Sequence, residues 1–251
     1  MEFENVSVVI TGGGSGIGSA TTRAFLAAGA RVAFTYATSV DEARAIELEY
    51  NRNGRRALAI KADATDPAEV ERAFAQAQEA FGPVEVLFAN AGGLLKRSRL
   101  TETPLSLWQE AFAVNVTSAM LACQAALRVM EPRRKGSIIL MSSLAALNGG
   151  GNGASHYAAA KGAIATLTLS LAKEVGPLGI RVNAVAPGLI ATRFHDIFST
   201  PEGRQAGVTR TPLRREGQPE DVADVVLSLA SERSRFITGE VVKITGGQEL
   251  A

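Results

Sequence analysis

The sequence predicts an α/β fold: a single Rossmann-type doubly wound domain over residues 1–251, with a seven-stranded parallel sheet and helices on both faces. Three observations predict it. Short apolar runs alternate with helical segments, a glycine-rich turn joins the first run to the first helix, and no repeat or linker interrupts the alternation. With 251 residues, of which 46% are hydrophobic, the chain is long enough for one large domain.

The expected strands are the apolar runs at residues 6–10, 31–35, 57–60, 85–89, 137–141, 180–186 and 240–244. The expected helices cover residues 19–28, 41–51, 66–81, 103–130, 219–230 and the segment around Tyr157 that ends at Gly176. Right-handed crossovers place a ligand along the carboxyl ends of such strands. Residues 189–218 are interrupted by two prolines, and we expect them to form a long loop that serves as a substrate lid.

Composition excludes several classes of function. The 26 basic and 25 acidic residues leave a net charge of +1, which gives no electrostatic reason to expect nucleic acid or an anionic membrane as partner. One cysteine, Cys123, cannot form a disulfide within the chain, and with only two histidines no metal site is expected. The first residues lack a signal-peptide pattern and no uncharged apolar run is long enough to span a bilayer, so we expect a cytoplasmic protein.

The turn after the first strand predicts phosphate binding. It contains Gly12, Ser15, Gly16, Ile17 and Gly18, followed directly by a helix. Glycines let the backbone approach a pyrophosphate, and the helix N-terminus supplies N–H groups and a favourable dipole. The spacing differs from the commoner G-x-G-x-x-G, but the flanking strand and helix favour a dinucleotide over a plain turn.

The end of the second strand bears on cofactor choice. Between Tyr36 and Ser39 there is no carboxylate to bond a ribose hydroxyl, and Thr38 and Ser39 can donate hydrogen bonds to a 2′-phosphate. NADP(H) is therefore favoured, whereas NAD(H) stays possible because no arginine or lysine stands here or at Ser15. After the third strand, in Asp63-Ala64, the aspartate either meets the adenine or caps the turn.

Tyr157 and Lys161 carry the expected chemistry. Four residues apart on a helix, they share one face. An ammonium about 4 Å from the phenol would contribute roughly 4 kcal/mol at an effective dielectric near 20. That would lower the phenol pKa by roughly three units, toward 7, and suit it to exchange a proton with a carbonyl or alcohol oxygen. The alternative is an ordinary amphipathic helix, and only the surrounding motifs favour catalysis.

Further residues follow the strand ends. The small residues of Asn90-Ala91-Gly92 allow the chain to pass close to a ligand, and Pro187-Gly188 turns the chain sharply. Asn115 is an unfavourable residue inside a helix, so it either faces the surface or holds a kink or a water.

These motifs resemble those of the short-chain dehydrogenase/reductase family over nearly the whole chain, and its 3-oxoacyl carrier-protein reductase-like branch most. The matching positions are Thr11-Gly12-x-x-x-Gly16-x-Gly18, Asp63, Asn90-Ala91-Gly92, Asn115, Ser143, Tyr157-x3-Lys161, Asn183, Pro187-Gly188 and Thr192. Ser143 stands one residue further from Tyr157 than is usual in the family, in front of an extended glycine loop at 149–153. Ser142 is therefore kept as an alternative to Ser143.

The resemblance implies a role for each residue. Tyr157 would be the general acid or base, Lys161 would lower its pKa and bond the nicotinamide ribose, and Ser143 would polarise the substrate oxygen. Asn115 would hold a water that relays protons to Lys161. The implied cofactor site comprises Gly12, Ser15, Gly16, Ile17, Gly18, Tyr36, Thr38, Asp63, Ala64, Asn90, Ala91, Gly92, Tyr157, Lys161, Pro187, Gly188, Ile190 and Thr192.

We therefore expect an NADP(H)-dependent carbonyl reductase or secondary-alcohol dehydrogenase for a small molecule. A non-catalytic NAD(P)-sensing protein would be expected to have lost the tyrosine or lysine, and the glycine spacing argues against a nucleotide-sugar epimerase or dehydratase. Pocket residues are expected from the lid and the opposite wall, namely Phe194, His195, Ile197, Phe198, Gly93, Leu94, Leu95 and His156. Lid arginines would favour a phosphopantetheine-bearing or acidic substrate, and the family suggests a homotetramer.

Overall fold

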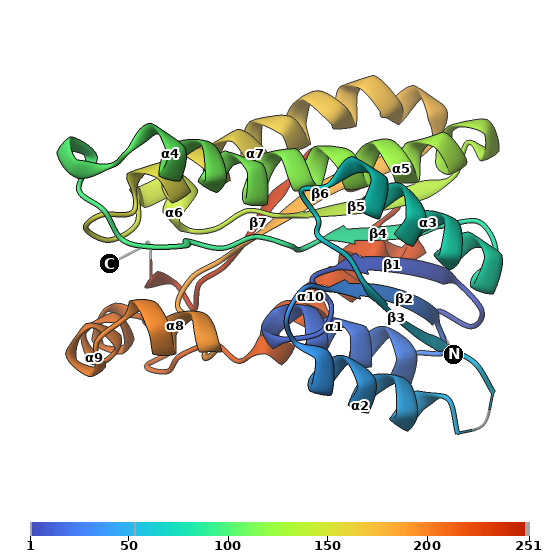
Figure 1. Ribbon diagram of the computed structural model, residues 1–251, viewed down its shortest axis with the longest axis horizontal. Helices are drawn as coiled ribbons and strands as arrows, with labels where there is room; N and C mark the ends of the chain where they lie inside the picture. Colours follow the sequence, from blue (N-terminus) through green and yellow to red (C-terminus); the bar gives the residue numbers. More distant parts are fainter. Residues whose placement is uncertain (1, 53, 249–251) are drawn as a thin grey trace.

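The computed structural model describes residues 2–52 and 54–248. Its centre is one sheet in which every neighbouring pair of strands is parallel (Figure 1). The strand order is β3(Ala57–Lys61), β2(Arg31–Tyr36), β1(Ser7–Thr11), β4(Val86–Ala89), β5(Gly136–Met141), β6(Ile180–Pro187), β7(Val241–Ile244). The order reverses between β1 and β4, and such a switch point opens a crevice at the carboxyl ends of the strands. The predicted seven-stranded parallel sheet is confirmed.

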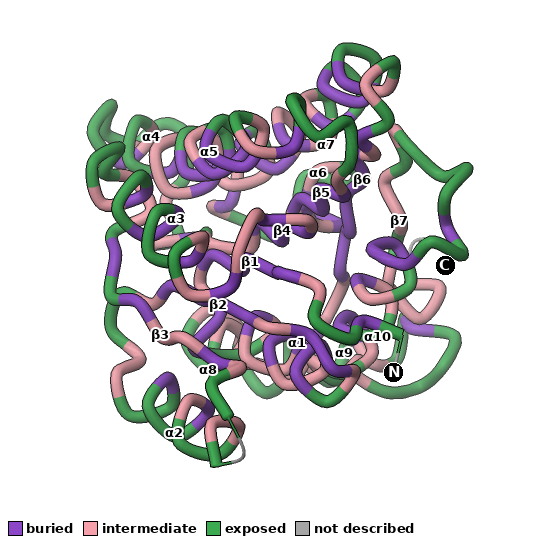
Figure 2. The backbone as a smooth tube through the Cα atoms, turned by 90° about the vertical axis from the view of Figure 1, so that its right-hand side faces the viewer, coloured by how far each residue is buried: buried purple, intermediate pink, exposed green. Residues whose placement is uncertain are grey.

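Helices cover both faces of this sheet, as Figure 1 shows. One face carries α3(Pro67–Phe81), α5(Ser118–Arg133) and α7(Ser155–Val175), and the other α1(Gly16–Ala27), α2(Val40–Tyr50) and α10(Pro219–Ala230). Strand side chains alternate between the two: Val9 packs toward α3 and α5, Val8 and Ile10 toward α1. Because both faces are covered, the central strands β1 and β4 are buried along their whole length and are continuous apolar runs, whereas the edge strands β3 and β7 are partly exposed (Figure 2).

Local chemistry explains where the helices begin. Asp66 caps α3 by accepting hydrogen bonds from the N–H groups of Ala68 and Glu69, at 2.8 and 3.0 Å, and Pro67 occupies the first helical position. The prediction that residues 189–218 form a loop is wrong, because this segment contains two helices, α8(Arg193–Phe198) and α9(Pro201–Arg210). The second of them begins with the same capping arrangement as α3. Thr200 accepts from Gly203 N at 3.1 Å, so Pro201 starts a helix rather than interrupting one.

The long helix expected at residues 103–130 is present but not regular. It consists of α4(Leu105–Phe112), a π-helical turn Ala113–Thr117 and α5. By length and composition alone the stretch Leu105–Arg133 is apolar enough to cross a membrane, although the sequence predicted no such span. In this fold its buried residues, among them Ala122 and Ala126, pack on the sheet as in a core helix.

Candidate active site

A cleft of about 1030 Å³ opens at the carboxyl edge of the sheet, where the strand order reverses. Most of the residues predicted for cofactor and catalysis line it: Gly12, Ser15, Gly16, Ile17, Gly18, Tyr36, Thr38, Asn90, Ala91, Gly92, Ser143, Tyr157, Lys161, Pro187, Gly188, Ile190 and Thr192. Three predicted residues, Asn115, Asp63 and Ala64, do not line the cleft. Segments far apart in sequence therefore meet at one site.

The glycine turn has the geometry of a phosphate cradle. Gly12 and Gly16 have φ values of +65° and +51°, in the left-handed region that favours glycine. A Cβ at Gly18 would collide with the carbonyl oxygen of Gly12. The first turn of α1 can therefore lie this close to the end of β1 only because residue 18 has no side chain. No side chain caps the N-terminus of α1, where backbone N–H groups and the helix dipole favour an anion. These features fit the pyrophosphate of NAD(P).

Asn90 fixes this turn. Its Nδ2 donates to the carbonyl oxygens of Thr11 and Gly12 at 3.1 and 2.9 Å. In return, Thr11 Oγ1 accepts from the backbone N–H groups of Asn90 and Ala91, both at 3.1 Å. The ends of β1 and β4 are thus tied together across the switch point. The sequence placed Asn90 beside the cofactor but did not show that it holds the turn's shape.

The cleft wall that follows β2 is formed by Tyr36, Thr38 and Ser39. Residues 36–39 include no aspartate or glutamate, so this part of the wall carries no carboxylate. Asp63 is exposed, and its Oδ1 accepts from the backbone N–H and the hydroxyl of Thr65, both at 2.8 Å. Of the two alternatives for Asp63, the structure shows the turn cap, and contact with adenine stays a prediction.

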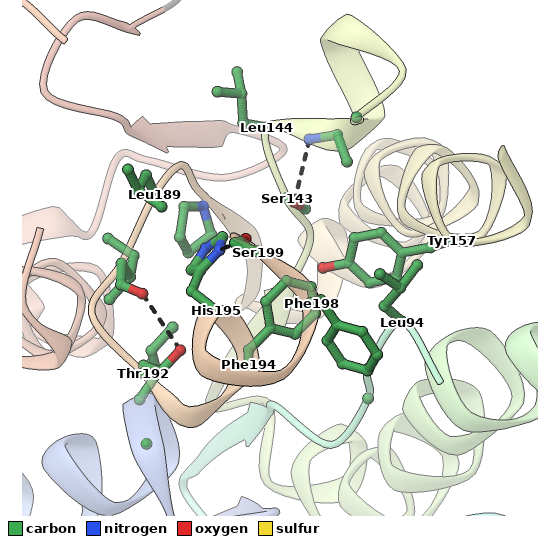
Figure 3. A pocket seen from close by; sticks show the side chains of 18 of the residues that line it. Leu94, Ser143, Leu144, Tyr157, Leu189, Thr192, Phe194, His195, Phe198 and Ser199 are labelled. Carbon is green, nitrogen blue, oxygen red and sulfur yellow. Dashed lines mark hydrogen bonds between the residues drawn. The ribbon is translucent and has the colours of Figure 1, made fainter. Parts of the chain in front are cut away.

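Ser143 and Tyr157 form the polar centre of the cleft (Figure 3). Burial raises the pKa of the Tyr157 phenol, and the neighbouring hydroxyl of Ser143 acts in the opposite direction with a smaller effect, so the net shift is upward. Ser143 Oγ also accepts from Ala145 N at 3.1 Å. Ser142 instead donates to the backbone carbonyl of Lys161 at 3.0 Å. Of the two serines, Ser143 is therefore the one beside Tyr157.

Lys161 lies next to the ring of Tyr157. It is buried, and its Nζ donates to the carbonyl oxygen of Met141 at 2.8 Å and lies 5.6 Å from the centre of the Tyr157 ring. Desolvation lowers the pKa of Lys161 to about 7. The expected lowering of the Tyr157 pKa toward 7 is wrong for this structure, because the ammonium lies over the ring and burial outweighs other effects.

Asn115 does not line the cleft but hydrogen-bonds the backbone of Gly93, which does. It is 1% exposed, in the π-helical turn, so the surface-facing alternative is wrong and the helix irregularity is confirmed. Its Oδ1 accepts from Gly93 N at 3.0 Å, and its Nδ2 donates to the carbonyl oxygens of Gly93 and Ala111 at 2.8 and 2.9 Å. A Cβ at Gly92 would lie 2.5 Å from Asn115 Oδ1 and 3.2 Å from Lys161 Nζ, so the three residues are in close contact.

The substrate side of the cleft has an aromatic wall from α8 (Figure 3). The ring of Phe194 lies 5.9 Å from that of Tyr157, and 5.1 Å from each of Phe198 and His195. His195 Nδ1 shares a 2.8 Å hydrogen bond with Ser199 Oγ. Burial lowers the pKa of His195, and the charges of Arg204 and Arg97 lower it further against the opposing effects of Glu216 and Asp196.

Three expected pocket residues are elsewhere. His156 is fully buried, and its Nε2 shares a 3.1 Å hydrogen bond with the carbonyl of Leu94, so it supports the wall from behind. Ile197 is 64% exposed, on the outer side of α8, and Leu95 does not line the cleft. The sequence analysis does not identify other lining residues, among them Arg97, Leu144, Asn148, Asn152 and Leu189. Their positions depend on long-range folding that no local pattern reveals.

Comparisons with known proteins agree with this geometry. Residues 12–249 match a family model described as enoyl-(acyl carrier protein) reductase. L-rhamnose 1-dehydrogenase (NAD(P)(+)) of Azotobacter vinelandii is 40% identical, over 96% of this chain and 95% of that protein. The 3-oxoacyl-[acyl-carrier-protein] reductase of Escherichia coli is 35% identical over the whole of both chains.

Solved structures show the same likeness. Levodione reductase has a TM-score of 0.92 at 31% identity, with 99% of each chain covered. A blue fluorescent protein from a metagenomic library, in complex with NADPH, has a TM-score of 0.90 at 36% identity, also with 99% of each chain covered. The chain therefore belongs to the short-chain dehydrogenase/reductase family and is an NAD(P)-dependent oxidoreductase of the CH–OH/C=O class.

Proposed function

We propose that the protein is an NADP(H)-dependent reductase of ketones, acting in reverse on secondary alcohols, with Tyr157 as proton donor or acceptor. The observation that carries this proposal is that Ser143, Tyr157 and Lys161 line one cleft together with the glycine turn, with Lys161 Nζ 5.6 Å from the centre of the Tyr157 ring. NADP(H), when bound, supplies or accepts the hydride.

The residues of the chain handle the proton and the orientation of the substrate. Burial raises the pKa of Tyr157, so its hydroxyl keeps its proton across the neutral range and is ready to donate it to a carbonyl oxygen that becomes an alcohol. Ser143 can hydrogen-bond the same oxygen and stabilise the charge that develops on it. The Nζ of Lys161 donates to the carbonyl oxygen of Met141 and lies over the ring of Tyr157, where it can contribute further hydrogen bonds and, when protonated, a positive charge.

Preference for NADP(H) over NAD(H) is supported by Tyr36, Thr38 and Ser39 in the cleft wall, since no carboxylate there would repel a 2′-phosphate. Titration of the protein with NADPH and NADH tests it, and equal affinity for both would contradict it. The name of the A. vinelandii relative allows either cofactor, and the metagenomic neighbour contains NADPH.

The assembly proposed is a cytoplasmic homotetramer that associates through α5 and α7. Supporting it, these helices carry Met120 and Leu169, which are 36% and 49% exposed in the single chain. Light scattering at several protein concentrations measures the mass directly. A monomer at micromolar concentration would contradict this assembly.

The substrate class is narrowed by the aromatic wall. Phe194 and Phe198 offer apolar surface next to Tyr157, which favours a substrate with an apolar body, such as a 3-oxoacyl thioester or another ketone. Related proteins are named for a sugar, an acyl thioester and a phenyl-substituted succinyl-CoA.

The test follows NADPH and NADH oxidation against a panel of ketones that includes a 3-oxoacyl thioester. Tyr157→Phe removes only the hydroxyl, and we expect it to lower kcat by about 10² or more, as for loss of a positioned acid. Cofactor binding should be retained. A Tyr157→Phe variant as active as the wild type would disprove the mechanism, whereas cofactor binding without turnover of any ketone or alcohol would favour a non-catalytic NAD(P) sensor.

A further inference from the structure

The glycine loop at residues 149–153 has a structural partner, the segment Arg97–Ser98 that follows β4. Ser98 N donates to the carbonyl of Gly153 at 2.9 Å, and Arg97 Nη1 donates to the carbonyl of Asn152 at 2.9 Å. A Cβ at Gly151 would lie 3.2 Å from Arg97 Nη1, and one at Gly153 would lie 2.9 Å from Ser98 N. The loop is therefore free of side chains where the arginine lies against it.

A second contact joins Arg97 to helix α8. Its Nε donates to the carbonyl of Phe198, at the end of α8, at 2.9 Å. The guanidinium group is thus fixed between two backbone carbonyls that are far from it in sequence, one on the glycine loop and one on α8. It lines the same cleft as Phe194 and Phe198. A guanidinium held in this way has lost much of its freedom before any ligand arrives.

No carboxylate among the described residues forms an ion pair with Arg97. The nearby carboxylates of Asp196 and Glu216 both bind Arg204, at 2.6 and 2.5 Å. Every charged side chain among the described residues that line the cleft is basic, namely Arg97, Lys161, Arg193 and Arg210. Nη2 of Arg97 forms no hydrogen bond with a described residue. An immobilised, unpaired guanidinium in a cleft is suited to a carboxylate.

We propose that Arg97, seated between the glycine loop 149–153 and the end of α8, binds a carboxylate on the substrate, at the end remote from the reacting carbonyl. This inference rests on the proposed function and specifies its substrate as an oxo acid, or the corresponding hydroxy acid, with an apolar spacer. The spacer lies against the aromatic wall, in which the ring of Phe194 is 5.9 Å from that of Tyr157 and 5.1 Å from that of Phe198. Arg97 follows directly, through the carbonyl of Phe198.

The experiment compares 4-acetylbenzoate with its methyl ester, which has the same acetylphenyl body but carries a methyl group in place of the carboxylate charge. Binding of each to the NADP⁺-loaded protein is measured by calorimetry. We expect the wild type to bind the acid about tenfold or more tighter than the ester, as for a charge-assisted hydrogen bond. Arg97→Gln should bring the two affinities to within about twofold. Arg97→Lys should keep part of the preference, because an ammonium retains charge but lacks the planar fork.

Arg99→Gln is the matched control, because it removes the same charge from an exposed position of the same segment, and the preference for the acid should survive in it. Circular dichroism shows that each variant is folded. The carboxylate site is disproved if the wild type binds the ester as well as the acid or binds neither probe, and equally if Arg97→Gln keeps the preference.

NADPH oxidation in the same mixtures separates this inference from the proposed function. If the acid binds through Arg97 but neither probe nor any other ketone is reduced, the carboxylate site stands and the reductase proposal fails. If both probes are reduced with equal kcat/KM, in wild type and Arg97→Gln alike, the reductase proposal stands and the carboxylate site fails.

Discussion

The side-chain amide of Asn115 pairs with the backbone of Gly93 in both directions, accepting from its N–H at 3.0 Å and donating to its carbonyl at 2.8 Å. The pair joins the π-helical turn to the segment after β4, and Gly92 in that segment touches both Asn115 and Lys161. A buried amide with three hydrogen bonds therefore sets the position of the backbone beside the lysine.

Asn115→Ala should lower the free energy of unfolding by about 3 kcal/mol. The substitution leaves the N–H and carbonyl of Gly93 and the carbonyl of Ala111 without their partner in a buried place, and each unsatisfied group costs roughly 1–3 kcal/mol. Urea denaturation measures the change, with Gln109→Ala, at an exposed position of α4, as the control. A loss no larger than that of the control would show that the amide pairing is not needed for stability.

Ser143→Ala should mainly lower activity, whereas Ser142→Ala should mainly lower the stability of the fold. Ser143 lies beside Tyr157 in the cleft, so its removal should lower kcat/KM for a ketone substrate by about 10² or more, with little loss of stability. Ser142 donates to the carbonyl of Lys161, so its removal should cost about 1 kcal/mol of stability and much less activity. NADPH oxidation and urea denaturation of both variants decide the matter. The reverse pattern would assign the catalytic hydroxyl to Ser142.

Lys161 should make stability depend on pH. Its pKa is lowered to about 7 in the folded chain from an ordinary value of 10.5. Between these values the unfolded chain binds one proton more than the folded chain, so the free energy of unfolding rises with pH, by at most about 1.4 kcal/mol per unit. Below pH 7 both states are protonated, and this contribution no longer changes with pH.

Lys161→Met should therefore remove a positive slope. The measurement is urea denaturation at about pH 7, 8 and 9, with wild type and variant compared at each pH. The difference in stability, wild type minus Lys161→Met, should rise with pH across this window. Lys173→Met, at an exposed position of the same helix, controls for the loss of a lysine as such. A constant difference would mean that Lys161 does not change its proton binding on folding in this range.

The fold could be predicted because its signals are local. Strands such as β1 are buried on both faces and so are continuous apolar runs, and the glycine turn follows the first of them directly. The lid forms helices where a loop is expected, and for α9 the reason is that Pro201 occupies the first helical position, where proline favours a helix.

The site residues that were missed or misplaced depend on partners distant in sequence. His156 follows Ser155 and precedes Tyr157, yet one step along a helix turns a side chain by about 100°, and His156 faces the carbonyl of Leu94 instead of the cleft. Arg97 is placed by Asn152 and Phe198, which are 55 and 101 residues away, and nothing near it in the chain indicates either contact. The pKa of Tyr157 was misjudged because spacing on a helix says nothing about burial.

Two glycines at helical positions should respond in opposite directions to a methyl group. A Cβ at Gly18, in the first turn of α1, would collide with the carbonyl of Gly12 and lie 2.7 Å from Asn90 Nδ2, both of which shape the glycine turn. A Cβ at Gly162, in α7, would meet nothing within 4 Å. Gly162→Ala should stabilise the protein by about 0.5–1 kcal/mol, because alanine favours a helix over glycine.

Gly18→Ala should instead destabilise the protein by about 1–3 kcal/mol, as for overpacking, and weaken NADPH binding by about tenfold or more, since the turn must open to admit the methyl group. Urea denaturation and titration with NADPH measure the two effects in parallel. If Gly18→Ala lost stability but bound NADPH as tightly as the wild type, the glycine turn would not be the phosphate cradle. If its affinity fell while Gly162→Ala kept full affinity, the loss would be specific to the turn.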